Sequence, residues 1–160
     1  MSRFADAADS PGFLLWHLTL QWQRQITAAL APLGLTHVQF VLLACTYWLN
    51  VRGESPNQLA VAAMAGTDVT MTSQVLRKLE SRGLVTRQTD ARDTRAKILA
   101  VTEAGAALAR EAIDVVEAAD QAFFSTWPPQ LAQALRDGPL PRATLRSDHG
   151  NLAVPTAETP

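Results

Sequence analysis

The chain has 160 residues, a length that suits one domain with a proper hydrophobic core. Its formal net charge of −1 argues against a protein that binds nucleic acid through overall positive charge alone. The single cysteine excludes an intramolecular disulfide. The sequence shows neither a signal-peptide pattern nor an apolar run of membrane-spanning length, so we expect a cytoplasmic protein that does not bind membranes.

The first predicted helix covers about residues 10–31, after a short polar segment, residues 1–9, that we expect to be flexible. Ser10 offers an N-cap, and Pro11 suits the first helical turn. Apolar side chains lie on more than one face of this helix, beginning with Phe13, Leu14 and Trp16. A helix of this kind needs more cover than its own domain provides, which predicts a dimer.

Two shorter helices follow. Thr36 and Gln39 have the spacing of a capping box, which predicts the start of a second helix that ends near residue 49. Ser55 followed by Pro56 predicts the N-cap and first turn of a third helix, which ends at about residue 65. The glycine at position 66 then predicts a turn.

A fourth predicted helix, residues 70–81, has two chemically different faces. Thr72, Val75, Leu76 and Leu79 share one face at helical spacing, and short polar side chains occupy the other. Hydroxyl, amide and guanidinium groups suit base edges and phosphates. With the helix before it, this segment predicts a helix-turn-helix whose second helix reads DNA.

A basic β-hairpin is predicted next, with strands at residues 84–89 and 97–101. Its tip carries Arg92 and Arg95, which we expect to enter the narrow minor groove, where negative potential is concentrated. Asp93 lies between them. Since phosphate repels a carboxylate, we expect Asp93 to brace an arginine of the hairpin or of the fourth helix.

The cations of the chain are concentrated here. Seven of the 14 lysines and arginines lie from Arg77 to Lys97, together with three acidic residues. Phosphate contacts require such a local stripe and not a high overall charge. We therefore predict contacts to phosphates from Lys78, Arg82 and Arg87. We predict contacts to the major groove from Thr70, Met71, Ser73, Gln74 and Arg77, with Met71 against a thymine methyl.

The C-terminal third is predicted to be helical. One long helix runs from Glu103 to about Ser125, and it exceeds what a small winged-helix core can cover. A brief helix follows at residues 130–136. Residues 137–160 contain four prolines and few apolar side chains, so we expect a flexible tail.

Taken singly, an arginine-rich turn is usually a solvated loop, and an amphipathic helix is usually only a helix. The combination is more specific, because the helix from Asp68 is followed by Asp90-x-Arg-Asp-x-Arg95 and then by Val101-Thr-Glu-Ala-Gly105. With these motifs, residues 35–108 resemble the MarR (multiple antibiotic resistance regulator) family of bacterial winged-helix transcription factors.

The resemblance implies a mainly α fold with a small antiparallel β-hairpin wing, in the α+β sense. A MarR-like winged helix-turn-helix domain would then cover residues 10–136, with its DNA-binding lobe at about 55–102. Helices at about 10–31 and 103–136 would form the dimer, because the first and last helices of two subunits interlock in that family.

Members of the family often bind small aromatic or phenolic effectors between the dimer body and the winged-helix lobe. Aromatic side chains gather on the first two predicted helices, where most of them suit core or dimer contacts. The resemblance implies a candidate effector pocket among them, in which His17 orients an anionic ligand. The residues are Trp16, His17, Trp22, Phe40 and Trp48.

Signals for other chemistry are missing from the sequence. His17, His37 and His149 have no partner at metal-ligand spacing, and no phosphate loop, zinc-protease pair or nucleophile elbow is present. We therefore expect no cofactor, no metal and no enzymatic activity. Cys45 lies in an apolar run and is expected to be a small core residue.

Together these patterns predict a regulator, expected to be a repressor, that binds double-stranded DNA as a homodimer. Two recognition helices would enter successive major grooves of a near-palindromic operator, roughly 34 Å apart, and a small aromatic effector would release them. The alternative is a winged-helix protein-interaction module without sequence-specific DNA binding. The alternative predicts weak, salt-sensitive affinity for any duplex.

Overall fold

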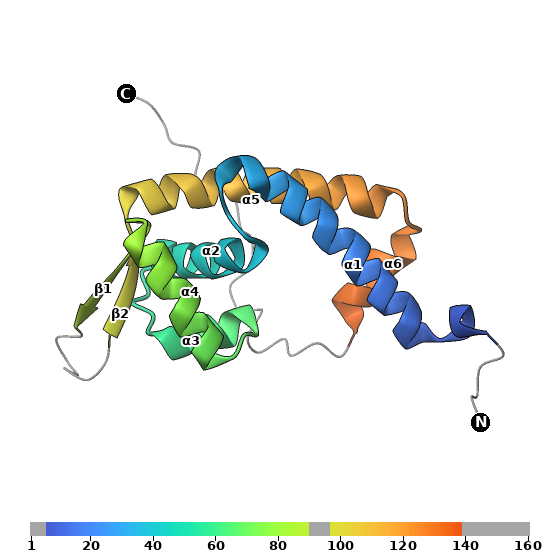
Figure 1. Cartoon of the computed structure of the whole chain (residues 1–160), viewed down its shortest axis with the longest axis horizontal. Helices are drawn as coiled ribbons and strands as arrows, with labels where there is room; N and C mark the ends of the chain where they lie inside the picture. The colour runs from blue at the N-terminus through green and yellow to red at the C-terminus, as the bar shows by residue number, and fades with distance from the viewer. Residues whose placement is uncertain (1–5, 90–96, 139–160) are drawn as a thin grey trace.

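The computed structural model describes residues 6–89 and 97–138, which form a mainly helical fold with one β-hairpin (Figure 1). This confirms the predicted fold class. The predicted tail from 139 and the first five residues of the predicted flexible N-terminus lie outside the described residues. The elements are η1 (Ala7–Asp9), α1 (Pro11–Leu30), η2 (Ala31–Leu33), α2 (His37–Val51), α3 (Gln58–Ala65), α4 (Val69–Ser81), β1 (Val85–Thr89), β2 (Lys97–Val101), α5 (Glu103–Ser125) and α6 (Pro129–Asp137).

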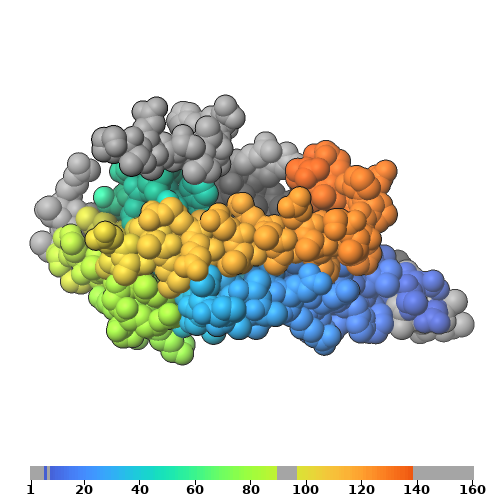
Figure 2. Space-filling view, turned by 90° about the horizontal axis from the view of Figure 1, so that it is seen from above, coloured from blue at the N-terminus to red at the C-terminus, as the bar shows by residue number. Residues whose placement is uncertain are grey.

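The two longest helices, α1 and α5, extend away from a lobe made of α2, α3, α4 and the hairpin (Figure 1). Figure 2 shows α1 and α5 side by side along the long axis of the molecule. Ile26 and Leu30 of α1 are buried in the same core as Ala109, Ala112 and Val116 of α5. The predicted long fifth helix is therefore confirmed, and it runs from the lobe, alongside α1, to α6 (Figure 1).

Within residues 6–89 and 97–138, no single helix is long and apolar enough to cross a membrane. The segments Pro11–Leu33 and His37–Val51 meet the length and composition test only as a pair, which is bent by 73°.

The start of α2 is confirmed as a capping box. The Thr36 Oγ1 accepts from the Gln39 backbone N–H at 3.3 Å, and the Gln39 Oε1 accepts from the Thr36 N–H at 3.1 Å. These two bonds pair backbone groups that the first turn leaves without helical partners. The first residue of α2 is therefore well defined, and Leu42, Leu43 and Leu49 of this helix are buried in the core.

The predicted start of the third helix is wrong by two residues. Asn57, and not Ser55, is the N-cap of α3, and its Oδ1 accepts from the Ala60 N–H at 2.9 Å. Pro56 is excluded from the helix because its carbonyl accepts from the Leu99 N–H of β2 at 2.8 Å. A strand that is distant in sequence thus holds this segment extended.

The hairpin pairs β1 with β2 in antiparallel register, from Val85 opposite Val101 to Thr89 opposite Lys97. The first strand begins at Val85, one residue later than predicted. The side chain of Val85 is only 1% exposed. Leu99 of β2 is equally buried, so the base of the wing is part of the hydrophobic core.

Gly105 is required where the wing returns to α5. A Cβ at this position would lie 1.9 Å from the Leu84 carbonyl oxygen, far inside contact distance. The Thr102 N–H donates to the same oxygen at 3.1 Å, and the Thr102 Oγ1 caps α5 by accepting from the Gly105 N–H at 2.9 Å. The Val-Thr-x-x-Gly pattern therefore encodes a close joint between the wing and α5.

We expect Gly105→Ala to lower the free energy of unfolding by about 1–3 kcal/mol or more, since the added methyl must displace backbone. Gly12→Ala is the matched control, because a Cβ at position 12 meets nothing within 4 Å. That change in an exposed part of α1 should raise stability slightly. Urea denaturation of both variants measures the difference, and equal stabilities would contradict the close joint.

Candidate nucleic-acid interface

The N-terminus of α4 is held by three side-chain hydrogen bonds. Asp68 is its N-cap, and its Oδ1 accepts from the Met71 N–H at 2.8 Å. The Thr72 Oγ1 donates to the Asp68 carbonyl at 2.7 Å. From α3, the Gln58 Nε2 donates to the Val69 carbonyl at 3.2 Å. The start of this helix is therefore fixed relative to α3, as a rigid reading helix requires.

The two faces of α4 are divided as predicted. Thr72, Val75, Leu76 and Leu79 are buried in the core. On the opposite face, Ser73 is half-buried, and the exposed polar residues are Thr70, Gln74, Arg77, Lys78 and Ser81. An amide and a guanidinium thus project outward from a helix that is anchored on its other side.

Met71 differs from its polar neighbours. It is half-buried and packs against the hydrophobic core, so it belongs in part to the interior. By contrast, Val69 at the first position of α4 is 45% exposed. The contact between Met71 and a thymine methyl stays a prediction. Because Met71 is half-buried, only part of its side chain is free to make that contact.

Two of the predicted phosphate contacts are already engaged within the protein. The Arg82 Nη1 donates to the Gly34 carbonyl at 2.9 Å, although the residue is exposed. The half-buried Arg87 donates from Nη2 to the Ser73 carbonyl at 3.2 Å, and its Nε lies 3.4 Å from the Glu80 Oε2 without hydrogen-bond geometry. Arg87 thereby ties β1 of the wing to α4.

The wing tip, with Arg92, Asp93 and Arg95, lies outside the described residues. At the last described pair of the hairpin, the Lys97 Nζ donates to the Thr89 Oγ1 at 2.9 Å. Both residues are exposed, so the hairpin carries a positive charge toward its tip.

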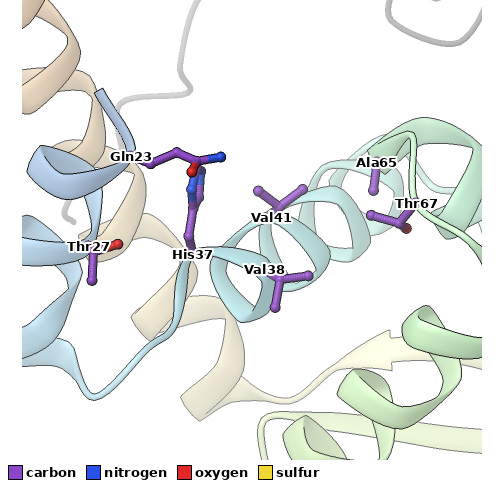
Figure 3. A pocket seen from close by; sticks show the side chains of 7 residues that line it. All are labelled: Gln23, Thr27, His37, Val38, Val41, Ala65 and Thr67. Carbon is purple, nitrogen blue, oxygen red and sulfur yellow. The ribbon is translucent and has the colours of Figure 1, made fainter. Parts of the chain in front are cut away.

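An open pocket of about 480 Å³ lies where α1, α2 and the turn before α4 meet (Figure 3). Polar groups come from α1, from the first residue of α2 and from the turn before α4, and apolar groups come from α2 and the end of α3. The lining residues are Gln23, Thr27, His37, Val38, Val41, Ala65 and Thr67.

The five residues predicted for an effector pocket are not among those that line this one. Trp16 and His17 are exposed on α1, while Phe40 and Trp48 are half-buried against other parts of the molecule. Trp22 is adjacent to the pocket, because its ring meets the His37 ring edge-on with centroids 5.1 Å apart. The aromatic set therefore stays a prediction, with Trp22 as its best-placed member.

The polar side of the pocket continues into α5. The Trp22 Nε1 donates to the Asp120 Oδ1 at 2.7 Å. Burial lowers the pKa of His37 below its ordinary value of 6.5, and this effect outweighs the Asp120 carboxylate, which raises it. The folded protein therefore favours a neutral imidazole at the pocket.

Cys45 is half-buried against the core, and burial raises its pKa to about 11, so the thiol stays protonated at neutral pH. In the parts of the chain that the structure describes, no group of three or more His, Cys, Asp or Glu residues is placed to hold a metal ion.

Comparisons with known proteins agree with this geometry. A family model described as "ArnR1-like, winged-helix domain" matches residues 33–118. The chain is 42% identical over 124 residues to the HTH-type transcriptional regulator YdcH of Bacillus subtilis, covering 78% of this chain and 84% of YdcH. A solved MarR-family transcriptional regulator from Rhodococcus sp. RHA1 is 31% identical, with a TM-score of 0.72 over 84% of this chain and 94% of that one.

The chain belongs to the MarR family of winged-helix transcriptional regulators. A further solved relative is CouR from Rhodococcus jostii RHA1 bound to p-coumaroyl-CoA. It is 30% identical, with a TM-score of 0.70 over 84% of this chain and 91% of CouR. The predicted family is therefore confirmed.

Four polar residues line the pocket in this MarR-family chain, and the sequence prediction included none of them. Gln23 and Thr27 are four residues apart, so they share one face of α1, and His37 opens α2 directly after its N-cap. Those spacings are visible in the sequence. The sequence does not show that these side chains meet at one pocket, because this depends on how α1 folds back onto α2.

The pKa of His37 offers a direct test of this arrangement. In an NMR titration the imidazole should titrate below 6.5, and Asp120→Asn should move the midpoint lower still. The asparagine keeps an acceptor for the Trp22 indole but removes the charge that raises the pKa. The stability that neutral His37 contributes is complete above about pH 6.5 and is lost as the pH falls through its folded pKa. A midpoint that rises in the variant would contradict the placement.

Proposed function

We propose that this MarR-family regulator binds a near-palindromic DNA operator as a homodimer and acts as a repressor. The observation that carries the proposal is the outward polar face of α4, on a helix whose opposite face is buried. In helix-turn-helix proteins the second helix enters the major groove with its N-terminal residues at base edges. The acting compartment would then be the one that holds the DNA, the cytoplasm.

Each type of side chain on α4 would contact a different part of the DNA. Gln74 suits a bidentate contact with adenine, and Arg77 suits guanine, while Thr70 and Ser73 can bond either. Lys78 and Arg82 would face phosphates. Since Arg87 is bonded to Ser73 and close to Glu80, we assign it mainly to bracing the wing.

A second copy of the chain is the proposed cover for exposed apolar residues on α1. Phe13, Leu14, Leu15 and Trp16 are between 45% and 58% exposed, although burying such a side chain is worth about 1.5–3 kcal/mol. This part of α1 and helix α6 lie at the same end of the molecule, away from the lobe (Figure 1). Trp127 and Leu135 add exposed apolar surface there. A dimer formed at this end would leave both α4 helices free for DNA.

A small aromatic or phenolic effector is the proposed ligand of the pocket beside His37. The pocket joins α1 and α2 to the turn before α4, so a ligand there contacts both the dimer helices and the reading lobe. The solved relative CouR is bound to an aromatic thioester, p-coumaroyl-CoA. An effector that binds preferentially to a dimer with misplaced α4 helices would lower DNA affinity by its differential affinity for that state.

The alternative, a protein-interaction module without sequence-specific DNA binding, is not favoured. The relatives of this chain are transcriptional regulators by name. The exposed face of α4 is polar apart from Val69 at its first position.

Gln74→Ala should reduce discrimination at one base pair in each half-site by about 1–3 kcal/mol, because a bidentate amide contact is lost. Competition binding with single-base operator variants measures this loss. Gln121→Ala changes an exposed glutamine on α5 and should leave discrimination unchanged. A uniform loss across all sequences would reduce Gln74 to a positioning role.

Arg95→Ala should weaken operator binding and lower the slope of log affinity against log salt by about one unit. The reason is that each cationic contact releases counterions from the DNA. Titrations from low to high salt measure the slope. An unchanged affinity and slope would remove the wing arginine from the proposed interface.

A further inference from the structure

Asn50, near the end of α2, uses its whole carboxamide on the wing and the adjoining turn. Its Oδ1 accepts from the Val101 N–H at 2.8 Å. Its Nδ2 donates to the Leu99 carbonyl and to the Glu54 carbonyl, both at 3.2 Å. All of the hydrogen-bonding capacity of the side chain apart from one acceptor lone pair is therefore directed at backbone groups.

These bonds lie on the edge of β2 that faces away from β1. On that edge the Leu99 N–H also donates to the Pro56 carbonyl, and Asn57 forms an isolated bridge with Ile98. The inner strand of the wing thus has partners on both sides. Among the residues that hold this second edge, Asn50 alone belongs to a helix in the described structure.

Helix α2 gives Asn50 a rigid base. Leu42, Leu43 and Leu49 are buried, and the helix packs against α3, α4 and α5. Through Asn50, the wing is therefore anchored to the same hydrophobic core that holds α4. On the other strand, Arg87 ties β1 to the Ser73 carbonyl of α4. Arg87 on β1 and Asn50 on β2 are therefore side-chain contacts through which helices of the lobe hold the two strands of the hairpin.

We infer that Asn50 is a positioning residue for DNA binding, which fixes the direction of the wing relative to α4. The inference rests on the proposed function, because the wing must contact DNA for its direction to matter. Loss of the carboxamide leaves the Leu99 carbonyl and the Val101 N–H without the partner that ties them to α2. The wing then contacts DNA only in a fraction of the molecules, while the face of α4 is unchanged.

The test compares Asn50→Leu, which is nearly isosteric and has no hydrogen-bonding group, with Asn50→Ala, which avoids crowding. Thr86→Val is the matched control. It removes the bond from the Thr86 Oγ1 to the Ala100 carbonyl, 3.3 Å long, which lies within the hairpin and does not reach α2. Operators selected from a random duplex library by the wild-type protein serve as the DNA.

For both Asn50 variants we expect about a tenfold loss of operator affinity and a salt slope lower by about one unit, with base preferences unchanged. Amide hydrogen exchange at Val101 should accelerate in the same variants. Thr86→Val should keep its affinity within about twofold of wild type. Thermal melting checks that each variant is folded.

Wild-type affinity and slope in both folded Asn50 variants would overturn the inference. So would an equal loss in Thr86→Val, or a loss of base discrimination together with affinity, because either points to general destabilisation. If the wild-type protein selects no operator, the proposed function fails. Exchange at Val101 then tests the anchoring alone, and unchanged protection in Asn50→Leu overturns it.

Discussion

The close approach of Gly105 to the Leu84 carbonyl is the constraint on which the winged lobe depends. At this joint the end of α4, the base of the wing and the start of α5 meet within one hydrogen-bonded unit, and a single methyl group would not fit. Because the joint is tight, the wing leaves the body at a fixed place and α5 begins at a fixed angle beside it.

Much of the fold follows from local patterns in the sequence. The capping box at Thr36, the apolar stripe of α4 and the two strands of the hairpin each depend on neighbouring residues, so they are predictable. The start of α3 is not, because Pro56 bonds to Leu99, more than forty residues away. The same reason limits prediction of the site. The outward face of α4 is a local property, whereas the engagement of Arg87 and the pocket beside His37 depend on packing between distant segments.

The arrangement explains how a protein with a net charge of −1 is suited to DNA. Positive charge is concentrated locally, on α4 and the hairpin, although the net charge of the chain is slightly negative. Arg77 and Lys78 are exposed on a helix anchored by its apolar side, and the arginines that would be free in an extended chain are partly used to hold the lobe together. On the proposed function, contacts to base edges would supply sequence specificity, and contacts to phosphates would position the protein on the DNA.

On the proposed function, two α4 helices, one from each subunit of a dimer, read the same DNA molecule. Selection of bound sequences from a random duplex library, followed by sequencing, tests it most directly. We predict an enriched inverted repeat whose half-site centres are separated by about one helical turn, roughly 34 Å, or by a whole multiple of it. Enrichment of a single unrepeated site, or no enrichment above the starting library, would contradict the account.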